Sequence, residues 1–165
     1  GFERNISDEL AKAIAKKGGV VQVPFGVPFI NRKAADNVQA YFSAMSALQK
    51  RNAAAQAAGK PLEDEAAFDA QWPIDHPVPA TDIGAVLDQI DYAVKLIGID
   101  HVGLGSDFDG VDGALPQGLL TVADFPNLVA GLQARGYKDA DIRKILGGNL
   151  LRVWTEVEAS AGSAR

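Results

Sequence analysis

The chain has 165 residues, of which 47% are hydrophobic, and its 16 lysine and arginine residues against 21 aspartate and glutamate residues give a formal net charge of −5. This composition is typical of a soluble globular protein, and the absence of cysteine excludes a disulfide scaffold and a cysteine-ligated zinc module. The acidic balance disfavours a nucleic-acid partner, and no apolar run approaches the roughly 20 residues that a transmembrane segment needs.

The first third of the chain predicts a helix, a strand, a loop and a longer helix. Residues 7–17 are predicted to form a helix, because acidic residues stand at the start of this segment and lysines at its end. The β-branched run at 19–23 indicates a buried strand that stops at Pro24, and 24–31 is predicted as a loop. Apolar residues then recur every three or four positions, which predicts a long helix over 33–58.

Prolines separate this long helix from the next clear one. Residues 63–72 can form a further turn or two of helix, but Pro73 and the prolines after it predict that this helix ends there. We therefore expect a connector over 73–80. Thr81 is the predicted N-cap of a helix that runs to Ile97, and the apolar stripe of this helix is wide enough to cover a sheet.

The second half of the chain is predicted to contain a short strand with two glycines, a glycine-rich loop and three helices, over 101–106, 107–118, 121–133, 139–147 and 148–159. Thr121 and Asp124 have the spacing of a capping box, which favours a helix start there. Strands that alternate with helices of this length indicate an α/β fold with a parallel sheet. Because two parallel strands cannot bury the faces of so many helices, the sequence predicts the last part of a larger α/β domain.

An aspartate at the end of the second strand is the sharpest chemical signal. Asp107 follows the apolar strand 101–106 and precedes a glycine-rich loop. In parallel α/β folds, active sites lie at the carboxyl ends of the strands, where a carboxylate can orient or deprotonate a metal-bound water. The alternative is that Asp107 only caps the following turn. Asp109, next to Gly110, is interpreted as a turn former.

The other acids and the histidines give weaker signals for metal binding. Asp107, Asp109 and Asp112 are clustered, but their spacing does not match an EF-hand calcium loop. His76 and His101 are the only imidazoles, and neither belongs to an HxH or HExxH motif. His76 is expected in a surface loop, and His101 at the opposite end of the strand from Asp107. The sequence therefore predicts no transition-metal site built by this chain alone.

Arg4 is the candidate cation for substrate binding. By itself it would be an ordinary exposed side chain, but an arginine can bind a carboxylate through two parallel hydrogen bonds, which lysine cannot imitate. The chain begins at Gly1 without an initiator methionine or the pattern of a signal peptide, so we expect an internal piece of a longer chain. The cellular compartment is left open.

Taken together, these segments resemble the renal, or membrane, dipeptidase family of metal-dependent peptidases. The resemblance is carried by RNISDEL at 4–10, GGVV at 18–21, HVGLGSDFDG at 101–110 and GGNLLRV at 147–153. It implies a (β/α)₈ TIM barrel of the metal-dependent hydrolase type, of which residues 1–165 are the C-terminal portion. This portion would hold two barrel strands plus helices, with a helical and proline-rich insertion near 43–80.

The resemblance also implies a reaction and a cofactor. It implies two zinc ions, whose ligands lie upstream of this chain, and a zinc-bridging hydroxide that hydrolyses the peptide bond of small dipeptides. By the same comparison, Arg4 binds the C-terminal carboxylate of the dipeptide and Asp107 assists proton transfer to the leaving amine. Gly26, Phe29 and Gln89 depart from the family pattern near the substrate, so no side-chain preference is carried over.

Two other functions remain open at this point. The first is another barrel metallohydrolase acting on an amide, a lactone or a phosphoester, because a strand-end aspartate serves all of these reactions. The second is a non-catalytic truncated chain. The chain alone is expected to be inactive because it lacks the metal ligands, the predicted partner is a dipeptide, and homodimer formation is left open.

Overall fold

The first helix and the first strand of the computed structural model, which describes residues 5–111 and 113–162, follow the predicted order. Helix α1 (Asp8–Lys16) begins where the Ser7 side chain accepts a hydrogen bond from the Leu10 amide. Strand β1 (Val21–Pro24) follows it. This strand starts two residues later than predicted and includes the proline, because Pro24 lies at its last position, where a missing amide hydrogen removes little of the ladder.

Strand β2 (Val102–Ser106) pairs with β1 in a parallel, two-stranded sheet. The register sets Val21 opposite Val102 and Val23 opposite Leu104. His101 was predicted inside this strand, but it closes a single 3₁₀ turn directly before it. The architecture is therefore α/β, mostly helical, with two parallel strands among the described residues.

The remaining helices extend the predicted pattern and correct some of its boundaries. They are α2 (Val27–Ile30), α3 (Arg32–Ala57), α4 (Glu65–Asp75), α5 (Ile83–Ile97), the 3₁₀ turn Val122–Asp124, α6 (Phe125–Ala134), α7 (Asp139–Arg143), the π-helical turn Lys144–Gly148 and α8 (Asn149–Gly162). The predicted capping box between Thr121 and Asp124 is confirmed. Among the described helices, none has the length and apolar character required to cross a lipid bilayer.

Three boundary predictions were wrong for local reasons. The predicted loop 24–31 contains α2, because Pro28 lies in the first helical turn, where its fixed φ is favourable. Helix α4 continues through Pro73 to Asp75, because a proline so near the helix end removes few hydrogen bonds. The N-cap of α5 is Asp82, whose carboxylate accepts a hydrogen bond from the Gly84 amide (2.8 Å).

The last boundary prediction placed two final helices over 139–147 and 148–159. A π-helical turn separates them instead, because Gly147 has non-helical backbone angles, and α8 begins at Asn149. Asn149 is 3% exposed, and its Nδ2 donates hydrogen bonds to the carbonyls of Ile99 (2.7 Å) and Val102 (2.8 Å). These bonds fix the start of α8 against the start of β2.

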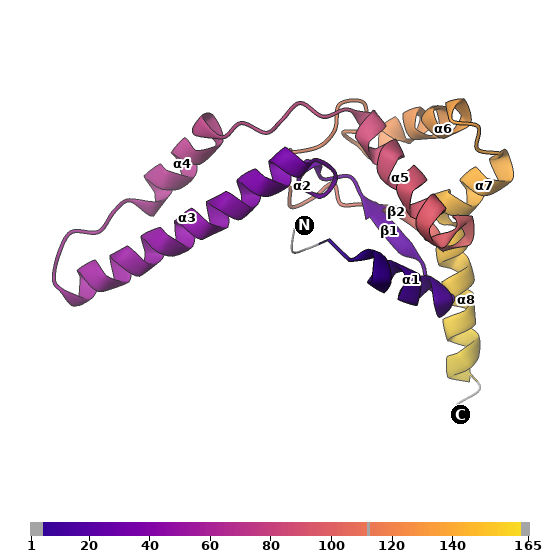
Figure 1. Ribbon diagram of the computed structural model, residues 1–165, viewed down its shortest axis with the longest axis horizontal. Coiled ribbons are helices and arrows are strands. Elements are labelled where there is room, and N and C mark those ends of the chain that lie inside the picture. The colour runs from indigo at the N-terminus through magenta and orange to yellow at the C-terminus, as the bar shows by residue number, and fades with distance from the viewer. Residues whose placement is uncertain (1–4, 112, 163–165) are drawn as a thin grey trace.

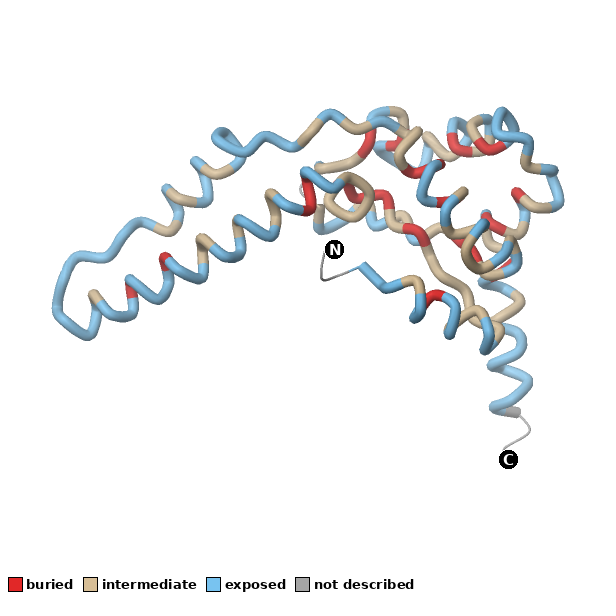
Figure 2. The backbone as a smooth tube through the Cα atoms, viewed as in Figure 1, coloured by how far each residue is buried: buried red, intermediate tan, exposed pale blue. Residues whose placement is uncertain are grey.

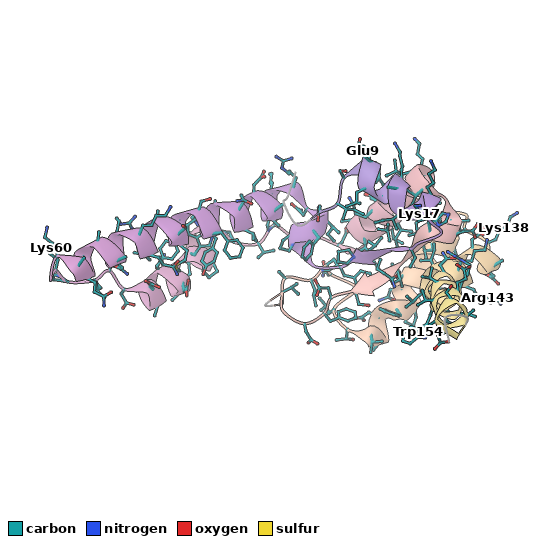
Figure 3. The ribbon with its side chains drawn as sticks, turned by 90° about the horizontal axis from the view of Figure 1, so that it is seen from below. Glu9, Lys17, Lys60, Lys138, Arg143 and Trp154 are labelled. Atoms are coloured by element: carbon teal, nitrogen blue, oxygen red, sulfur yellow. The ribbon has the colours of Figure 1, made fainter. Side chains whose placement is uncertain are left out.

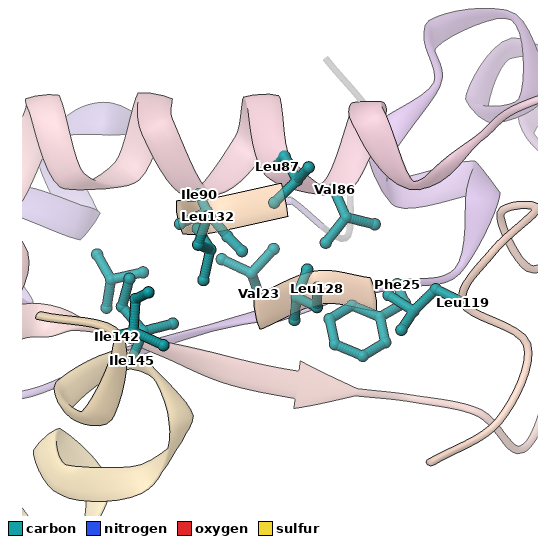
Figure 4. Packing of buried hydrophobic residues seen from close by; sticks show 11 residues of the cluster. Val23, Phe25, Val86, Leu87, Ile90, Leu119, Leu128, Leu132, Ile142 and Ile145 are labelled. Atoms are coloured by element: carbon teal, nitrogen blue, oxygen red, sulfur yellow. The ribbon is translucent and has the colours of Figure 1, made fainter. Parts of the chain in front are cut away.

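One hydrophobic core lies between the sheet and the helices α5, α6 and α7 (Figure 4). Its members, all buried, are Val23, Phe25, Val86, Leu87, Ile90, Val102, Leu119, Leu128, Leu132, Ile142 and Ile145. Helix α5 packs the predicted apolar stripe onto this core. Figure 2 shows that the buried residues concentrate around the sheet, whereas most of α3, α4 and α8 is exposed.

A helical hairpin stands apart from this core (Figure 1). It consists of α3, the following turn and α4, residues 32–75, and is called the arm below. It leaves the body shortly after β1 and returns before α5. The predicted connector 73–80 therefore shrinks to the segment between Asp75 and α5.

Candidate active site

The carboxyl ends of the two strands lie side by side and place Asp107 at this edge of the sheet. Pro24 of β1 is aligned with Ser106 of β2, and the Phe25 amide donates a hydrogen bond to the Ser106 carbonyl (2.8 Å). Asp107 is the next residue and is exposed. Its position is the predicted one, at the end of an apolar strand, where active sites of parallel α/β folds lie.

The backbone at this point has an uncommon conformation. Ser106 and Asp107 have φ angles of +54° and +63°, and they are the only described non-glycine residues with positive φ. A left-handed conformation is disfavoured for residues with a side chain and costs of order 1–3 kcal/mol at each position. Two such residues in succession end the extended conformation of β2 at Ser106.

A cavity of about 380 Å³ reaches Asp107 from the β1 side of the sheet. Its lining comes from the segment before α1, from α1, β1, α2 and α5, and from Asp107 itself. The lining residues are Asn5, Ile6, Ser7, Asp8, Ala11, Val21, Gln22, Val23, Pro24, Phe29, Ile30, Gln89, Tyr92, Ala93, Leu96, Ile97 and Asp107. Its volume is in the range of small-molecule sites, and its apolar wall carries a few polar groups, as such sites do.

Two hydrogen bonds fix polar groups of this cavity. The Asn5 side-chain amide donates to the Phe29 carbonyl (3.1 Å) and ties the segment before α1 to α2. The Tyr92 hydroxyl donates to Asp8 Oδ1 (2.6 Å) and joins α5 to α1. The bond to Asp8 raises the pKa of the Tyr92 hydroxyl above its ordinary value, because the phenolate would face a carboxylate.

Some lining residues were found from the sequence and others were missed. Of the three positions where the chain departs from the family pattern, Phe29 and Gln89 line the cavity and Gly26 does not. Gln22 was not identified as a site residue, although a single polar residue inside the β-branched run 19–23 is a signal that could have found it. A Cβ atom on Gly103 would overlap Gln22 Oε1, so the Gln22 side chain lies across the glycine of β2.

The loop that begins at Asp107 is held by the segments that follow β1. The Gln117 amide donates to the Thr81 carbonyl (2.8 Å), and the Ile83 amide donates to the Gln117 carbonyl (3.0 Å). The Val27 amide donates to the Ala114 carbonyl (2.8 Å). A second hollow of about 560 Å³ lies between these segments. Backbone hydrogen bonds therefore hold the later part of this loop, at Ala114 and Gln117, against the starts of α2 and α5.

Neither histidine lines the cavity that Asp107 lines. His101 is at the other end of β2, and its Nδ1 lies 2.8 Å from the Gly19 carbonyl oxygen. His76 directly follows α4, is exposed, and stacks on Trp72 with a ring separation of 3.9 Å. Within residues 5–111 and 113–162, no group of three or more His, Cys, Asp or Glu side chains could hold a metal ion.

Two of the predicted residues lie outside the described part of the chain. They are Arg4, the candidate for binding a substrate carboxylate, and Asp112, the third member of the acidic cluster. The residue after Arg4, Asn5, lines the cavity that Asp107 also lines. The end of β2 and the segment that Arg4 precedes therefore border the same cavity.

Sequence comparisons match this chain to a protein family and to individual relatives. A family model described as membrane dipeptidase, peptidase family M19, matches residues 2–165. The chain is 53% identical over 74 residues to dipeptidase ataJ of Aspergillus terreus, and this matched segment covers 44% of this chain and 18% of that protein. It is 44% identical over 80 residues to dipeptidase tcpJ of Claviceps purpurea, covering 48% of this chain and 19% of that protein. The chain spans about a fifth of the length of these relatives.

Solved structures match a larger share of this chain than the sequence relatives do. The probable dipeptidase PvdM from Pseudomonas aeruginosa superposes with a TM-score of 0.69 at 31% identity, over 95% of this chain and 42% of that one. A metallopeptidase from Rhodobacter sphaeroides, liganded with a phosphinate mimic of the dipeptide L-Ala-D-Ala, superposes with a TM-score of 0.59 over 89% of this chain and 30% of that one. At 24% identity, the second similarity concerns the fold alone.

Proposed function

Because the chain belongs to the membrane dipeptidase family, peptidase family M19, we propose that it forms the C-terminal part of a metal-dependent dipeptidase. Family membership itself supports a dipeptidase-type hydrolase. On this proposal, residues 1–165 are one portion of a single (β/α)₈ barrel domain, with the insertion near 43–80 standing outside the barrel. The parallel β1–β2 pair, with α5 in the connection and a free outer edge on each described strand, supports this placement.

The observation that carries the catalytic assignment is the position of Asp107. It is exposed at the carboxyl edge of the sheet, it lines the cavity, and its backbone adopts a costly left-handed conformation. Hydrolysis of a peptide bond takes a proton from the attacking water and delivers one to the leaving nitrogen. A carboxylate held at this edge can accept the first proton and donate it to the amine. We assign this proton transfer to Asp107.

The substrate assignment rests on Arg4. A dipeptide has a free carboxylate close to its scissile bond, and a guanidinium can hold it through two parallel hydrogen bonds. Asn5, the next residue, is fixed to the Phe29 carbonyl at the wall of the cavity. Binding at the C-terminal carboxylate would set the distance from that end to the reacting carbonyl, which favours dipeptides over longer chains.

The metals of the reaction do not fit the described residues. The family resemblance implies two zinc ions, but the described part of the chain contains no cluster of metal-ligating side chains. The ligands would therefore have to come from residues other than these. The roles proposed for Asp107 and Arg4 concern only a proton and a carboxylate. The chain alone is accordingly expected to be inactive.

The test is dipeptide hydrolysis by the complete barrel enzyme that contains this chain. We expect Asp107→Asn to lower kcat about 10²-fold or more, the usual scale for losing proton-transfer assistance, with little change in KM. Asp109→Asn is the matched control, because Asp109 is an exposed carboxylate two residues further along the same loop. An unchanged kcat in Asp107→Asn, or equal losses in both variants, would refute the role of Asp107.

The substrate panel separates the remaining alternatives. It contains L-Ala-D-Ala, the same dipeptide with an amidated C-terminus, a simple lactone and a phosphoester. The proposal expects cleavage of the free dipeptide and much weaker cleavage of the amidated one. Preference for the lactone or the phosphoester would place the enzyme in another class of barrel metallohydrolase.

A further inference from the structure

Phe108 follows Asp107 directly, at the point where β2 runs into the glycine-rich loop. The two parallel strands end on the side of the body from which the arm leaves, and the loop begins there (Figure 3). Phe108 is not among the described residues that line the cavity next to Asp107. Its ring packs against the hydrophobic core instead. Of these two successive residues, one therefore belongs to the candidate site and the other to the core.

Three phenylalanine rings meet where β2 ends. The ring centroid of Phe108 lies 5.6 Å from that of Phe25 and 6.1 Å from that of Phe125. The rings of Phe25 and Phe125 are also 6.1 Å apart, and Phe25 meets both neighbours edge-on, with interplanar angles of 67° and 78°. Aromatic rings attract one another at these separations and angles. Phe25, Phe108 and Phe125 therefore form one packed group, which is called the aromatic cluster below.

The two partners of Phe108 are themselves held at the ends of regular elements. Phe25 directly follows β1 and is fully buried, and its amide donates a hydrogen bond to the Ser106 carbonyl (2.8 Å). Phe125 is the first residue of α6 and directly follows the confirmed capping box. The aromatic cluster therefore joins the ends of β1 and β2 to the start of α6, and it gives the Phe108 ring a fixed surface to pack on.

Asp107 is held along the chain from both sides. On one side, the Ser106 carbonyl accepts the hydrogen bond from the Phe25 amide. On the other side, the Phe108 ring packs in the aromatic cluster. Ser106 and Asp107 have positive φ angles, and such a conformation persists in residues with side chains only where the surrounding contacts enforce it. Phe108 supplies a contact of this kind immediately after the second left-handed residue.

The next carboxylate along the loop is held less firmly. Asp109 is followed by Gly110, whose φ is +75° and whose Cβ position has no atom of the described residues within 4 Å, apart from its chain neighbours. The loop returns to the end of β1 only at Val111, since a Cβ atom on Gly26 would lie 2.9 Å from Val111 Cγ1. Of the two carboxylates at the start of the loop, Asp107 is therefore the one with fixed neighbours on both sides.

We propose that Phe108 is a positioning residue, whose ring, packed on Phe25 and Phe125, holds the Asp107 carboxylate where proton transfer requires it. This inference rests on the role proposed for Asp107 above. A catalytic group displaced by about 1 Å can lose up to about 10²-fold in rate, and packing of a neighbouring side chain in a core restricts such displacement. The phenylalanine ring exchanges no proton itself, so its effect on the reaction passes through Asp107.

Hydrolysis of a free dipeptide by the complete barrel enzyme that contains this chain tests the proposal. Phe108→Leu keeps an apolar side chain but removes the ring contacts, and it should lower kcat about 10-fold with little change in KM. Leu132→Ala is the matched control, because Leu132 belongs to the same core but lies apart from Phe25 (Figure 4). It should lower the melting temperature at least as much and leave kcat within about twofold of the wild type. A wild-type kcat in Phe108→Leu, or an equally large fall in Leu132→Ala, would overturn the proposal.

A double-mutant cycle separates positioning from a general loss of structure. If Phe108 acts through Asp107, adding Phe108→Leu to Asp107→Asn should change kcat by no more than about threefold, whereas independent effects would multiply to a total loss of about 10³-fold. A multiplied loss would overturn the positioning role and leave the role of Asp107 intact. A wild-type kcat in Asp107→Asn alone would instead refute both, so the two failures are distinguished. Far-UV circular dichroism checks the fold of each variant, and Phe108→Met, whose flexible side chain fills irregular core space, replaces Phe108→Leu if the latter does not fold.

Discussion

Asn149 offers the sharpest test of how the C-terminal helix is attached to the sheet. Asn149 is 3% exposed, and its side-chain amide donates both hydrogens, to the carbonyls of Ile99 and Val102, across about fifty residues of sequence. Asn149→Ala would leave both acceptors without this donor in a space too confined for easy hydration. At about 1–1.5 kcal/mol for each lost bond, the free energy of unfolding should fall by about 2–3 kcal/mol.

Urea unfolding followed by far-UV circular dichroism measures this loss. With a slope of about 2 kcal/mol per molar urea, the midpoint should fall by roughly 1 M. Asn127→Ala is the matched control, because Asn127 is exposed and donates a single hydrogen bond, to the Gly118 carbonyl. Asn149→Asp should cost more at pH 7 than Asn149→Ala, since a carboxylate would face two carbonyl oxygens. A midpoint shift in Asn149→Ala no larger than that in Asn127→Ala would refute the reasoning.

Three further predictions concern substrate binding, packing and charge. Arg4→Lys in the complete enzyme should raise the KM for free dipeptides with little change in kcat, and equal wild-type cleavage of free and amidated dipeptides would exclude this role. Gly131→Ala should lower the melting temperature despite its gain in helix propensity, because the new Cβ would lie 2.5 Å from Leu87 Cδ1 in the core. The ion pair with Lys144 (2.7 Å) lowers the pKa of Asp100, so its stabilisation exists above the unfolded-state pKa and is lost as the pH falls through the lower, folded-state pKa. Unfolding measured at pH 6 and pH 3 should therefore show a smaller acid-induced loss in Asp100→Asn than in the wild type.

Local signals in the sequence predicted the elements whose ends depend on neighbouring residues. Thr121 and Asp124 form the capping box that their spacing indicates, because both hydrogen bonds close within four residues. Asp82 replaces Thr81 as the N-cap of α5 for a reason that the sequence does not contain. The Thr81 hydroxyl donates to the Pro79 carbonyl and accepts from Asn31, which is fifty residues away. A cap that a distant side chain removes cannot be found from spacing alone.

Pro73 shows how a strong local rule can fail. Proline disrupts a helix interior because it removes an amide donor and its ring clashes with the preceding turn. Here the helix ends two residues later, and side-chain contacts bridge the last turn. Gln71 Nε2 donates to Asp75 Oδ1 (2.9 Å), and the His76 ring stacks on Trp72. Asp75 and His76 were predicted in the connector 73–80, and the periodicity of apolar residues could not indicate their contacts with Gln71 and Trp72.

Some features of the candidate site depend on neighbouring residues and could be predicted, whereas others depend on residues far apart in the sequence and could not. The position of Asp107 at the end of an apolar strand was predictable, because the run 101–106 and the glycines after it are local features. The cavity beside it was not, since Asp8 and Tyr92 meet across 84 residues of sequence. Gln22 lies between these cases, because the run 19–23 marks it as unusual but does not say which face of the strand it occupies.

The conformation of Ser106 and Asp107 is where the sequence and the structure disagree most. Nothing in the run 101–110 indicates two successive left-handed residues, and glycine, which adopts this conformation without strain, stands at Gly105 and Gly110 but not between them. A glycine at 107 would lower the strain and remove the carboxylate. Proteins break local rules of this kind mostly at functional sites, where the side chain is needed in spite of the backbone cost. The cost retained at Asp107 therefore argues for a chemical role of its carboxylate, and it does so independently of the family resemblance.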